Sequence, residues 1–157
     1  MINTVLCYIE RDGHWLMMNR NKKKNDLNEG KWVAVGGKFE EKESPIDCAI
    51  RETFEETGLQ LKSPTLRGIV TFVSNKYETE QMFIFHSTDF SGEVNFNCNE
   101  GTLCWQPISS IENLPVWEGD KLFHDLLIAD APFFSVKLEY EDDRLANAVV
   151  NGERIEL

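Results

Sequence analysis

The stretch VGGKFEEKESPIDCAIRETFEETGL, residues 35–59, decides the fold of this chain. Ser44 and Pro45 are typical of a helix start, because serine caps free backbone N–H groups and proline suits the first turn. Asp47 complements the helix dipole and can close a capping box with the serine. Gly58 is a natural C-terminal stop. The stretch therefore predicts a helix of about three and a half turns between these two ends.

The predicted helix, residues 45–57, has an apolar side and an acidic side. Six residues are expected to supply its buried surface: Ile46, Cys48, Ala49, Ile50, Thr53 and Phe54. Glu55 and Glu56 follow Glu52 by three and four positions, so all three are expected to project from one exposed face. Like charges at this spacing destabilise a helix by a few tenths of a kcal/mol per pair, and Arg51 offsets part of that through its i+4 partner Glu55.

Two interpretations of this acidic face are open from the residues alone. It can be an ordinary solvated helix surface. It can equally hold divalent cations, which prefer hard carboxylate oxygens as ligands. In the second case the backbone carbonyls of Gly36 and Gly37, just upstream, can join the set.

The rest of the pattern predicts strands around this helix and one further helix. Apolar runs at 3–10 and 14–19 flank Asp12-Gly13, which is typical of a hairpin turn. Residues 20–30 are polar and predict a loop, and a short strand follows in KWVAVGG. The other expected elements are a helix at 119–130 and strands at 66–73, 81–87 (after the polar turn SNKYETE), 103–108, 133–140 and 145–150. This order predicts an α+β fold or a layered αβα arrangement, with residues 1–157 as a single domain.

Composition excludes several classes of protein. Apolar residues make up 41% and aromatic residues 11% of the chain, as in globular proteins. The net charge of -11 disfavours duplex nucleic acid as a partner, since phosphate backbones need Lys and Arg. No apolar run reaches the ~18 residues of a membrane-spanning helix, and the N-terminal segment is interpreted as a strand rather than a signal peptide. We therefore expect a cytoplasmic protein without a membrane partner, whose four cysteines form no CxxC pair and are reduced and structural.

The same stretch resembles the Nudix box, G-x5-E-x7-R-E-U-x-E-E-x-G-U, in which U is a bulky apolar residue. Gly37 opens the motif, and the other fixed positions follow at the required spacing: Glu43, Arg51, Glu52, Glu55, Glu56, Gly58 and Leu59. Thr53 is the one departure, and a β-branched threonine can still pack in that position. A motif with this many fixed positions is far more specific than a lone GxGxxG.

The resemblance to Nudix hydrolases implies a fold, a reaction and a cofactor. The implied fold is a mixed β-sheet held between helices, and the implied reaction is hydrolysis of a nucleoside diphosphate linked to another moiety X. The implied cofactor is Mg²⁺ or Mn²⁺, which would neutralise the crowded carboxylates, bridge to phosphate oxygens and activate a water. It would be held by Gly36, Glu52, Glu55 and Glu56.

The resemblance also implies catalytic roles inside and outside the motif. Arg51 would orient the glutamates, Glu55 would act in catalysis as well as metal binding, and Glu43 would pair with Arg51 or support an outer metal. Glu100, just before a predicted strand, resembles the further carboxylate that many members use as a metal ligand or base. The alternative for Glu100 is an exposed acid in a loop.

A basic segment near the motif points to phosphates. Arg20 and Lys22–Lys24 interrupt an otherwise acidic chain, and Lys38 follows the first glycine of the motif. Arg20 and Lys38 are the candidates for phosphate contacts. A solvated loop is the alternative interpretation of the basic run.

Residues further along the chain point to a base pocket. Trp117 can stack on a base and Asp120 can share hydrogen bonds with a purine edge, although a core tryptophan and a helix-capping aspartate are equally ordinary. The order of segments is similar to that of MutT-type oxidised-purine nucleoside triphosphatases, and Phe72 fits a pocket aromatic. Val33 and Gly119 stand where that resemblance calls for Asn and Asp. Their lack of polar side chains predicts weak discrimination of 8-oxoguanine.

The expected activity is therefore metal-dependent hydrolysis of a (deoxy)nucleoside triphosphate, either an ordinary purine or an oxidised one such as 8-oxo-dGTP, to a monophosphate and pyrophosphate. Dinucleoside polyphosphates, nucleotide sugars and mRNA-like caps remain open as substrates. A nucleotide-sensing module without activity is the alternative from another class. A module that only senses nucleotides would have no need of the whole metal-binding set, which comprises Arg51, Glu52, Glu55 and Glu56. The sequence indicates no oligomeric state.

Overall fold

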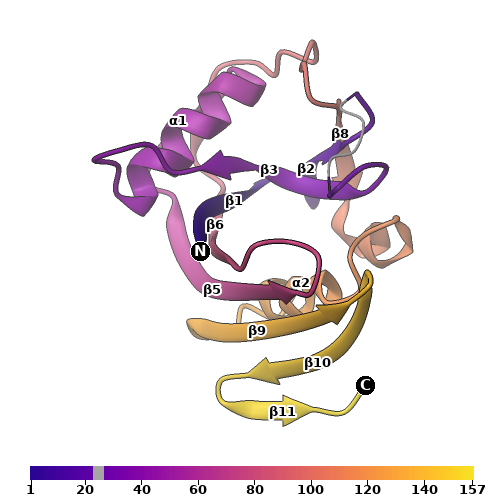
Figure 1. Cartoon of the computed structure of the whole chain (residues 1–157). Coiled ribbons are helices and arrows are strands. Elements are labelled where there is room, and N and C mark those ends of the chain that lie inside the picture. Colours follow the sequence, from indigo (N-terminus) through magenta and orange to yellow (C-terminus); the bar gives the residue numbers. More distant parts are fainter. Residues whose placement is uncertain (23–26) are drawn as a thin grey trace.

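The computed structural model describes residues 1–22 and 27–157, and nine of its strands form one mixed sheet (Figure 1). Along the sheet the order is β11-β10-β9-β5-β6-β1-β3-β2-β8. The β1–β6 and β5–β9 pairs are parallel, and the other neighbouring pairs are antiparallel. The elements are β1 (Ile2–Arg11), β2 (His14–Asn19), β3 (Trp32–Lys38), α1 (Pro45–Thr57), β4 (Gln60–Leu61), β5 (Thr65–Ser74), β6 (Glu80–Ser87), β7 (Phe90–Ser91), β8 (Thr102–Pro107), the 3₁₀ helix η1 (Ile108–Asn113), α2 (Asp120–Ile128), β9 (Phe134–Glu141), β10 (Arg144–Val150) and β11 (Glu153–Ile155). The predicted α+β fold is confirmed.

The two α-helices pack on opposite faces of the sheet, as the alternation along β1 demonstrates. Cys7 and Ile9 belong to the core cluster that includes Ala49 of α1. Tyr8, between them, belongs to the cluster on the other face, where its ring lies 6.3 Å from that of Phe123 in α2. Successive side chains of a strand point to opposite faces, so this one strand holds both layers together.

The helix α1 begins and ends as its sequence predicts. The Ser44 side chain accepts a hydrogen bond from the Asp47 N–H, and the Asp47 carboxylate accepts one from the Ser44 N–H, which completes the capping box. At the other end Gly58 has φ = 81°, the left-handed conformation that a glycine adopts without strain.

The predicted buried side of α1 is partly wrong. The helix buries Cys48, Ala49, Thr53 and Thr57. Ile46 and Phe54, expected in the core, are 46% and 55% exposed. The contact side consists of small residues because the helix lies close against the sheet, and a phenylalanine ring does not fit between such closely packed layers.

Turns with positive φ connect several strands. The first hairpin turns at Asp12 (φ 50°) and Gly13 (φ 73°), the type I′ pattern expected of Asp-Gly. The strands predicted at 133–140 and 145–150 also form an antiparallel hairpin, β9–β10. The chain adds β11 and the short pair β4–β7, which the sequence pattern did not predict.

No helix in the described parts of the chain has the length and apolar character needed to cross a membrane.

The cysteines pack as small apolar residues. All four are free, with Cys7, Cys48 and Cys98 buried and Cys104 half-buried. Burial raises the pKa of the Cys7 thiol to about 12, and the pKa of Cys48 rises to about 12 chiefly for the same reason. Thiols that stay protonated are poor nucleophiles, which agrees with the predicted structural role.

Candidate active site

Arg51 is the centre of an ion-pair network on α1. Its Nε lies 2.6 Å from Glu43, and its Nη1 lies 2.7 Å from Glu52 and 3.2 Å from Glu55. Its Nη2 also donates to the carbonyl of Lys38 at 3.0 Å. The guanidinium therefore ties the end of β3 to the helix and holds the acidic side chains in place, a geometry to which a planar fork of donors is suited.

The same network shifts the protonation of its members. The hydrogen bond from Arg51 lowers the pKa of Glu43 to about 2, and that bond in turn raises the pKa of Arg51. Burial raises the pKa of Glu52, although Arg51 works against this effect. Glu43 is thus a firmly ionised partner of Arg51, as predicted, whereas Glu52 has lost part of its hydration.

Glu56 differs from its neighbours and from its prediction. It was expected on an exposed helix face, but both carboxylate oxygens are buried, and no hydrogen-bond partner is found for them among the described residues. Burial, followed by the charges of Glu100 and Glu52, raises its pKa well above the ordinary value, while Arg20 and the nearby backbone of Gly36, which lies outside hydrogen-bond geometry, oppose the rise. A buried carboxylate without a partner is costly. A cation would satisfy it, so the donor set fits a divalent metal.

Two glycines of β3 make room for close contacts, one with a carboxylate and one with the neighbouring strand. A Cβ on Gly37 would lie 2.4 Å from the carboxyl carbon of Glu52, so only glycine leaves room for that side chain. A Cβ on Gly36 would collide with the backbone of Val5 in the neighbouring strand. The glycines that open the predicted motif therefore serve close packing, whether or not their carbonyls also bind a cation.

The acidic side chains do not form a compact metal cage as they stand. Across residues 1–22 and 27–157, no group of three or more Asp, Glu, His or Cys side chains is gathered tightly enough to hold an ion. Glu52 and Glu55 are turned toward Arg51 instead. Binding a cation between the carboxylates would require some of them to exchange Arg51 for the metal.

A segment far along the chain brings the fourth carboxylate to this place. Glu100, just before β8, lies 3.1 Å from Arg20 at the end of β2, and its charge contributes to the raised pKa of Glu56. Lys22 donates to the Cys98 carbonyl at 2.8 Å, which fastens the same loop. Lys23 and Lys24 of the predicted basic segment lie outside the described residues.

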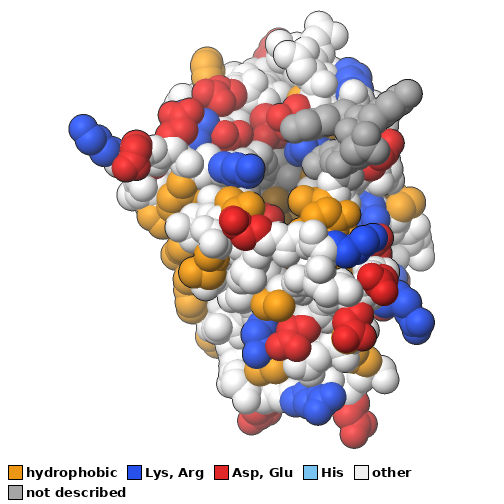
Figure 2. Space-filling model, in the orientation of Figure 1, with side chains coloured by type: hydrophobic (Ala, Val, Ile, Leu, Met, Phe, Trp, Pro, Cys, Tyr) orange, Lys and Arg blue, Asp and Glu red, His pale blue; other side chains and the backbone are white. Residues whose placement is uncertain are grey.

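A cleft of about 440 Å³ runs from these carboxylates across the sheet. Its wall includes most of the residues predicted to meet metal or phosphate: Arg20, Gly36, Lys38, Glu52 and Glu100. Figure 2 shows the hollow near the centre of this face, bordered by hydrophobic, acidic and basic side chains. The arrangement can accept an anionic chain whose charge is balanced by cations.

The cleft continues into a small inner pocket of about 50 Å³. Cleft and pocket share five wall residues: Leu6, Leu27, Asn28, Val33 and Glu80. Phe72, Trp117 and Asp120, the predicted base-binding residues, lie deeper and line only the pocket. As the side chains stand the pocket has room for little more than one or two waters, so a base must widen it or rest at the shared mouth.

Trp117 is held on several sides. Its Nε1–H donates to the Asn28 side chain at 2.8 Å, and the Lys31 ammonium lies 4.5 Å from its ring centroid. Phe72 and Tyr140 approach edge-on, with centroids 5.6 and 5.0 Å away. At 5% exposed, Trp117 is both a core residue and a pocket wall, so the two interpretations of its role are compatible.

Asp120 is a buried acid in this pocket. Burial, and then the nearby charge of Glu80, raise its pKa to about 7, while Lys31 opposes the shift. The carboxyl can therefore donate or accept a hydrogen bond near neutral pH.

The structure explains why position 119 carries no side chain. A Cβ on Gly119 would lie 2.6 Å from a methyl of Leu138 and 2.7 Å from the Tyr140 hydroxyl. That hydroxyl instead accepts a hydrogen bond from the Gly119 N–H at 2.7 Å. An aspartate cannot occupy this place while β9 fills it.

Two polar wall residues were missed by the sequence reasoning. Asn28 lies in the segment interpreted as a polar loop, and Glu80 was placed in the turn SNKYETE, whereas it is the first residue of β6. The predicted strand began one residue too late, at residue 81, so Glu80 was assigned to a polar turn instead of the pocket wall. The signal that could have found it is its place directly before the alternating run QMFIFHS.

Known proteins share this arrangement over most of the chain. The sequence model described as NUDIX domain matches residues 2–127. The uncharacterized Nudix hydrolase YvcI of Bacillus subtilis (strain 168) is 32% identical over 126 residues, which cover 78% of this chain and 76% of that protein. The oxidized purine nucleoside triphosphate hydrolase of Danio rerio is 29% identical over 112 residues, 71% of either chain.

A solved structure agrees with these sequence matches. The crystal structure of the Mutator MutT protein from Bacillus halodurans is similar with a TM-score of 0.86 and 26% identity, over 98% of this chain and 99% of that one. The motif that crowds carboxylates on α1 is thus found within a matched domain and a matched fold, and the chain belongs to the Nudix family as a MutT-like hydrolase.

Proposed function

We propose that this hydrolase cleaves purine nucleoside triphosphates to a monophosphate and pyrophosphate in a reaction that needs a divalent metal. The observation that carries the proposal is the continuity of the site. Carboxylates line one end of the cleft, and the other end opens into a pocket walled by Trp117 and Phe72. A ligand with a flat aromatic base at one end and an anionic chain at the other matches both parts. The name of the Danio rerio relative adds support.

The acidic residues are proposed to hold the metal and the reacting water. Mg²⁺ or Mn²⁺ would be held by Gly36, Glu52, Glu55 and Glu56. Glu56 would be stabilised most, because its buried carboxylate oxygens have no hydrogen-bond partner among the described residues. The cation would supply neutralisation of phosphate charge and Lewis-acid activation of water.

Arg51 and Glu100 are proposed to complete the chemistry. Arg51 would keep the glutamates oriented through its ion pairs. Glu100 would accept the proton of the water that attacks phosphorus, while the bond to the bridging oxygen breaks. Arg20 and Lys38, which both line the cleft, would contact the phosphate oxygens of the substrate.

The experiment is a nucleotide panel with Mg²⁺ or Mn²⁺, read out separately for pyrophosphate and inorganic phosphate. Pyrophosphate is expected from purine triphosphates. Glu100→Gln should slow the reaction strongly, while Glu93→Gln, an exposed acid of the same loop, should not. Phosphate as the product, or no turnover of any triphosphate with either metal, would contradict the proposal.

One observation favours a second candidate substrate class, a nucleoside diphosphate linked to a larger group. A second cavity of about 470 Å³ shares Glu52 and Glu100 with the cleft. Its wall also includes Glu55, Glu56, the exposed Phe54 ring and three asparagines: Asn95, Asn97 and Asn99. Amide groups and an aromatic surface suit a sugar. Nucleotide sugars and dinucleoside polyphosphates therefore belong in the panel.

We also propose that residues 1–157 act as one domain. The strands β9–β11 lie beyond the matched residues 2–127, yet Tyr140 of β9 contacts Trp117 and Phe72 at the pocket. A chain cut after α2 should lose this support and bind nucleotides poorly.

A further inference from the structure

We propose that Glu80 and Asn28 read the edge of the substrate base and select guanine-type bases over adenine. The inference rests on the proposed function, because it assigns the base preference of the same site. It goes beyond the expectation from Val33 and Gly119, which concerned only the weak discrimination of 8-oxoguanine.

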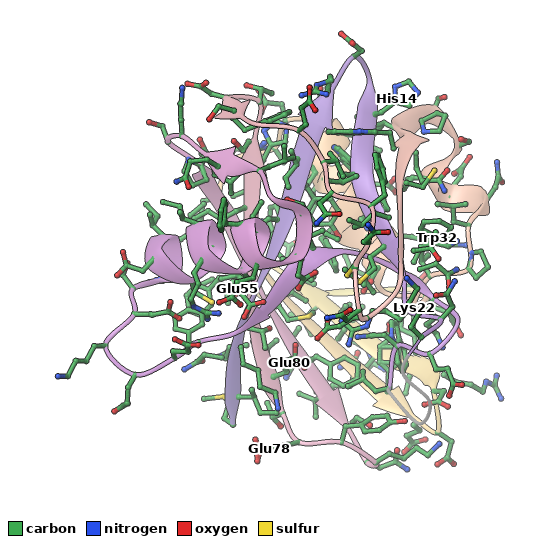
Figure 3. All side chains as sticks on the ribbon, turned by 90° about the horizontal axis from the view of Figure 1, so that it is seen from above. His14, Lys22, Trp32, Glu55, Glu78 and Glu80 are labelled. Carbon is green, nitrogen blue, oxygen red and sulfur yellow. The ribbon has the colours of Figure 1, made fainter. Side chains whose placement is uncertain are left out.

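The position of the two residues carries the first step. Both line the cleft and the inner pocket, so they stand at the mouth that the two share. Glu80 reaches this place from the start of β6, and Asn28 from the loop before β3. In Figure 3 Glu80 lies toward the centre of the molecule, whereas Glu78 lies at its outer edge.

The setting of Glu80 is the second step. Thr4, on the neighbouring parallel strand β1, donates its hydroxyl to Oε2 of Glu80 at 2.8 Å. This contact holds the carboxylate in the mouth rather than in solvent. An ionised carboxylate only accepts hydrogen bonds, and its two oxygens take up to about four of them. The base edge that suits it carries two adjacent donors.

The setting of Asn28 is the third step. Its Oδ1 accepts the Trp117 Nε1–H at 2.8 Å, which fixes which end of the amide is oxygen and which is nitrogen. The acceptor of this side chain is therefore engaged by Trp117, and its remaining hydrogen-bonding capacity is that of the NH₂ donors. A base that meets Asn28 is required to present an acceptor.

Guanine presents both features, and adenine presents neither in the required arrangement. The guanine edge carries the N1–H and N2–H₂ donors side by side, next to the O6 acceptor. Adenine has a lone pair at N1 and a donor at the 6-position, so it would place an acceptor against the carboxylate and a donor against the amide. A site built from fixed polar groups rejects such a mismatch strongly.

The same reasoning limits what these residues can discriminate. The edge with N1, N2 and O6 is common to guanine and 8-oxoguanine, because oxidation alters the opposite side of the purine. Glu80 and Asn28 are therefore expected to recognise guanine-type bases as a class. This agrees with the weak preference for oxidised guanine that the side chains at positions 33 and 119 predict.

The test compares dGTP with dATP in the wild type, Glu80→Gln and the matched control Glu78→Gln. Glu78 is an exposed acid two positions away that pairs with the N-terminus. The wild type and Glu78→Gln should prefer dGTP in kcat/KM by at least about tenfold. Glu80→Gln should bring the two nucleotides to within about threefold, since glutamine offers both a donor and an acceptor.

A second variant keeps the test valid if Glu80→Gln folds poorly. Asn28→Asp retains an acceptor for Trp117, replaces the NH₂ donors by an acceptor oxygen and adds a negative charge, so it should lower kcat/KM for dGTP by at least about tenfold. Thermal melting verifies that both variants are folded.

Binding separates this inference from the proposed function. Dissociation constants for the two nucleotides with Ca²⁺ in place of Mg²⁺ rank the bases without any turnover. Absence of hydrolysis together with a guanine preference in binding would overturn the proposed function and leave the base reading intact. Equal treatment of dGTP and dATP by the wild type, or an unchanged ranking in Glu80→Gln and Asn28→Asp, would overturn the base reading.

Discussion

The carboxylate end of the cleft and the base end are built by opposite means. The carboxylate end comes mostly from one helix, and its side chains are held by charge, with Arg51 contacting three glutamates within 3.2 Å. The base end collects one or two residues each from β1, β3, β5, β6, α2, the loop before β3 and the segment before α2, and aromatic packing holds it. We propose that the first region carries the chemistry and that the second region recognises the base.

The largest expected effect is at the carboxylate end. Glu56→Gln removes the charge of the buried, unpartnered carboxylate and should lower kcat by more than about a hundredfold, because even residues that only support metal ligands cost up to that amount. Glu41→Gln, an exposed acid in the turn before α1, is the matched control. The melting temperature of the metal-free Glu56→Gln protein should not fall, because the substitution removes a buried carboxylate that the charges of Glu100 and Glu52 repel. Near wild-type turnover in saturating Mg²⁺ would break the contrast between the two regions.

The second effect concerns pH and the base end. The folded pKa of Asp120, about 7, is above its ordinary value of 3.8, so the folded state binds this proton more tightly than the unfolded state. The contribution of Asp120 to the free energy of unfolding is therefore fully present below about pH 4 and is lost as the pH rises toward 7. Between about pH 5 and pH 7 the wild type should lose about 2–3 kcal/mol relative to Asp120→Asn, at roughly 1.4 kcal/mol per pH unit.

Denaturant unfolding of both proteins at several pH values, without nucleotide or metal, measures this difference. Parallel pH profiles would mean that Asp120 is ionised in the folded protein at pH 5. The aspartate would then be a simple acceptor in the pocket, and the two ends of the cleft would be more alike electrostatically than the structure indicates.

The third effect sharpens the division between binding and chemistry. Trp117→Ala should raise KM by about ten- to a hundredfold with a smaller change in kcat, because stacking of a base on an aromatic ring is worth roughly 1–3 kcal/mol. Trp117 is also a core residue, so Trp117→Phe, which keeps a ring and loses the hydrogen bond to Asn28, serves as the better-folded companion. A fall confined to kcat in both variants would assign Trp117 to the reaction instead.

The smallest expected effect is the stabilisation of the metal-free protein by added Mg²⁺. On the proposed metal site, Mg²⁺ would bind folded carboxylates that repel one another, so it should raise the melting temperature by about 2–4 °C, which corresponds to about 1 kcal/mol for a chain of this size. The rise should be modest because Glu52 and Glu55 must first leave Arg51. It should vanish in Glu56→Gln and persist in Trp117→Ala. Equal shifts in those two variants would place the cation away from the carboxylates.

The sequence predicted the carboxylate end well because its signals are local. The capping box at Ser44, the glycine at 58 and the spacing of the glutamates each act within a few residues, and the structure has all of them. The exposure of Phe54 was not predictable in the same way. Hydrophobicity identifies residues that can be buried, whereas the close approach of helix and sheet selects small ones.

The base end was predicted less completely because its contacts are distant in sequence. Trp117, Phe72 and Asp120 were named, yet the residues that complete the wall were not. Glu80 depends on a strand boundary, and the hydrogen bond from Gly119 to Tyr140 joins residues on separate elements. Local propensity carries no information on such pairings, which arise from the order of strands in the sheet.

The position of Tyr140 has a consequence for how the protein is made. Synthesis proceeds from the N-terminus, and domains form as their parts emerge. A nascent chain that has just released α2 already contains every residue of the ion-pair network of Arg51, but Trp117 still lacks the ring, and Gly119 the hydroxyl, that Tyr140 of β9 supplies. We therefore expect nucleotide to stabilise the folding chain only after β9 has joined the sheet, whereas the proposed metal ligands all precede β9 in the chain.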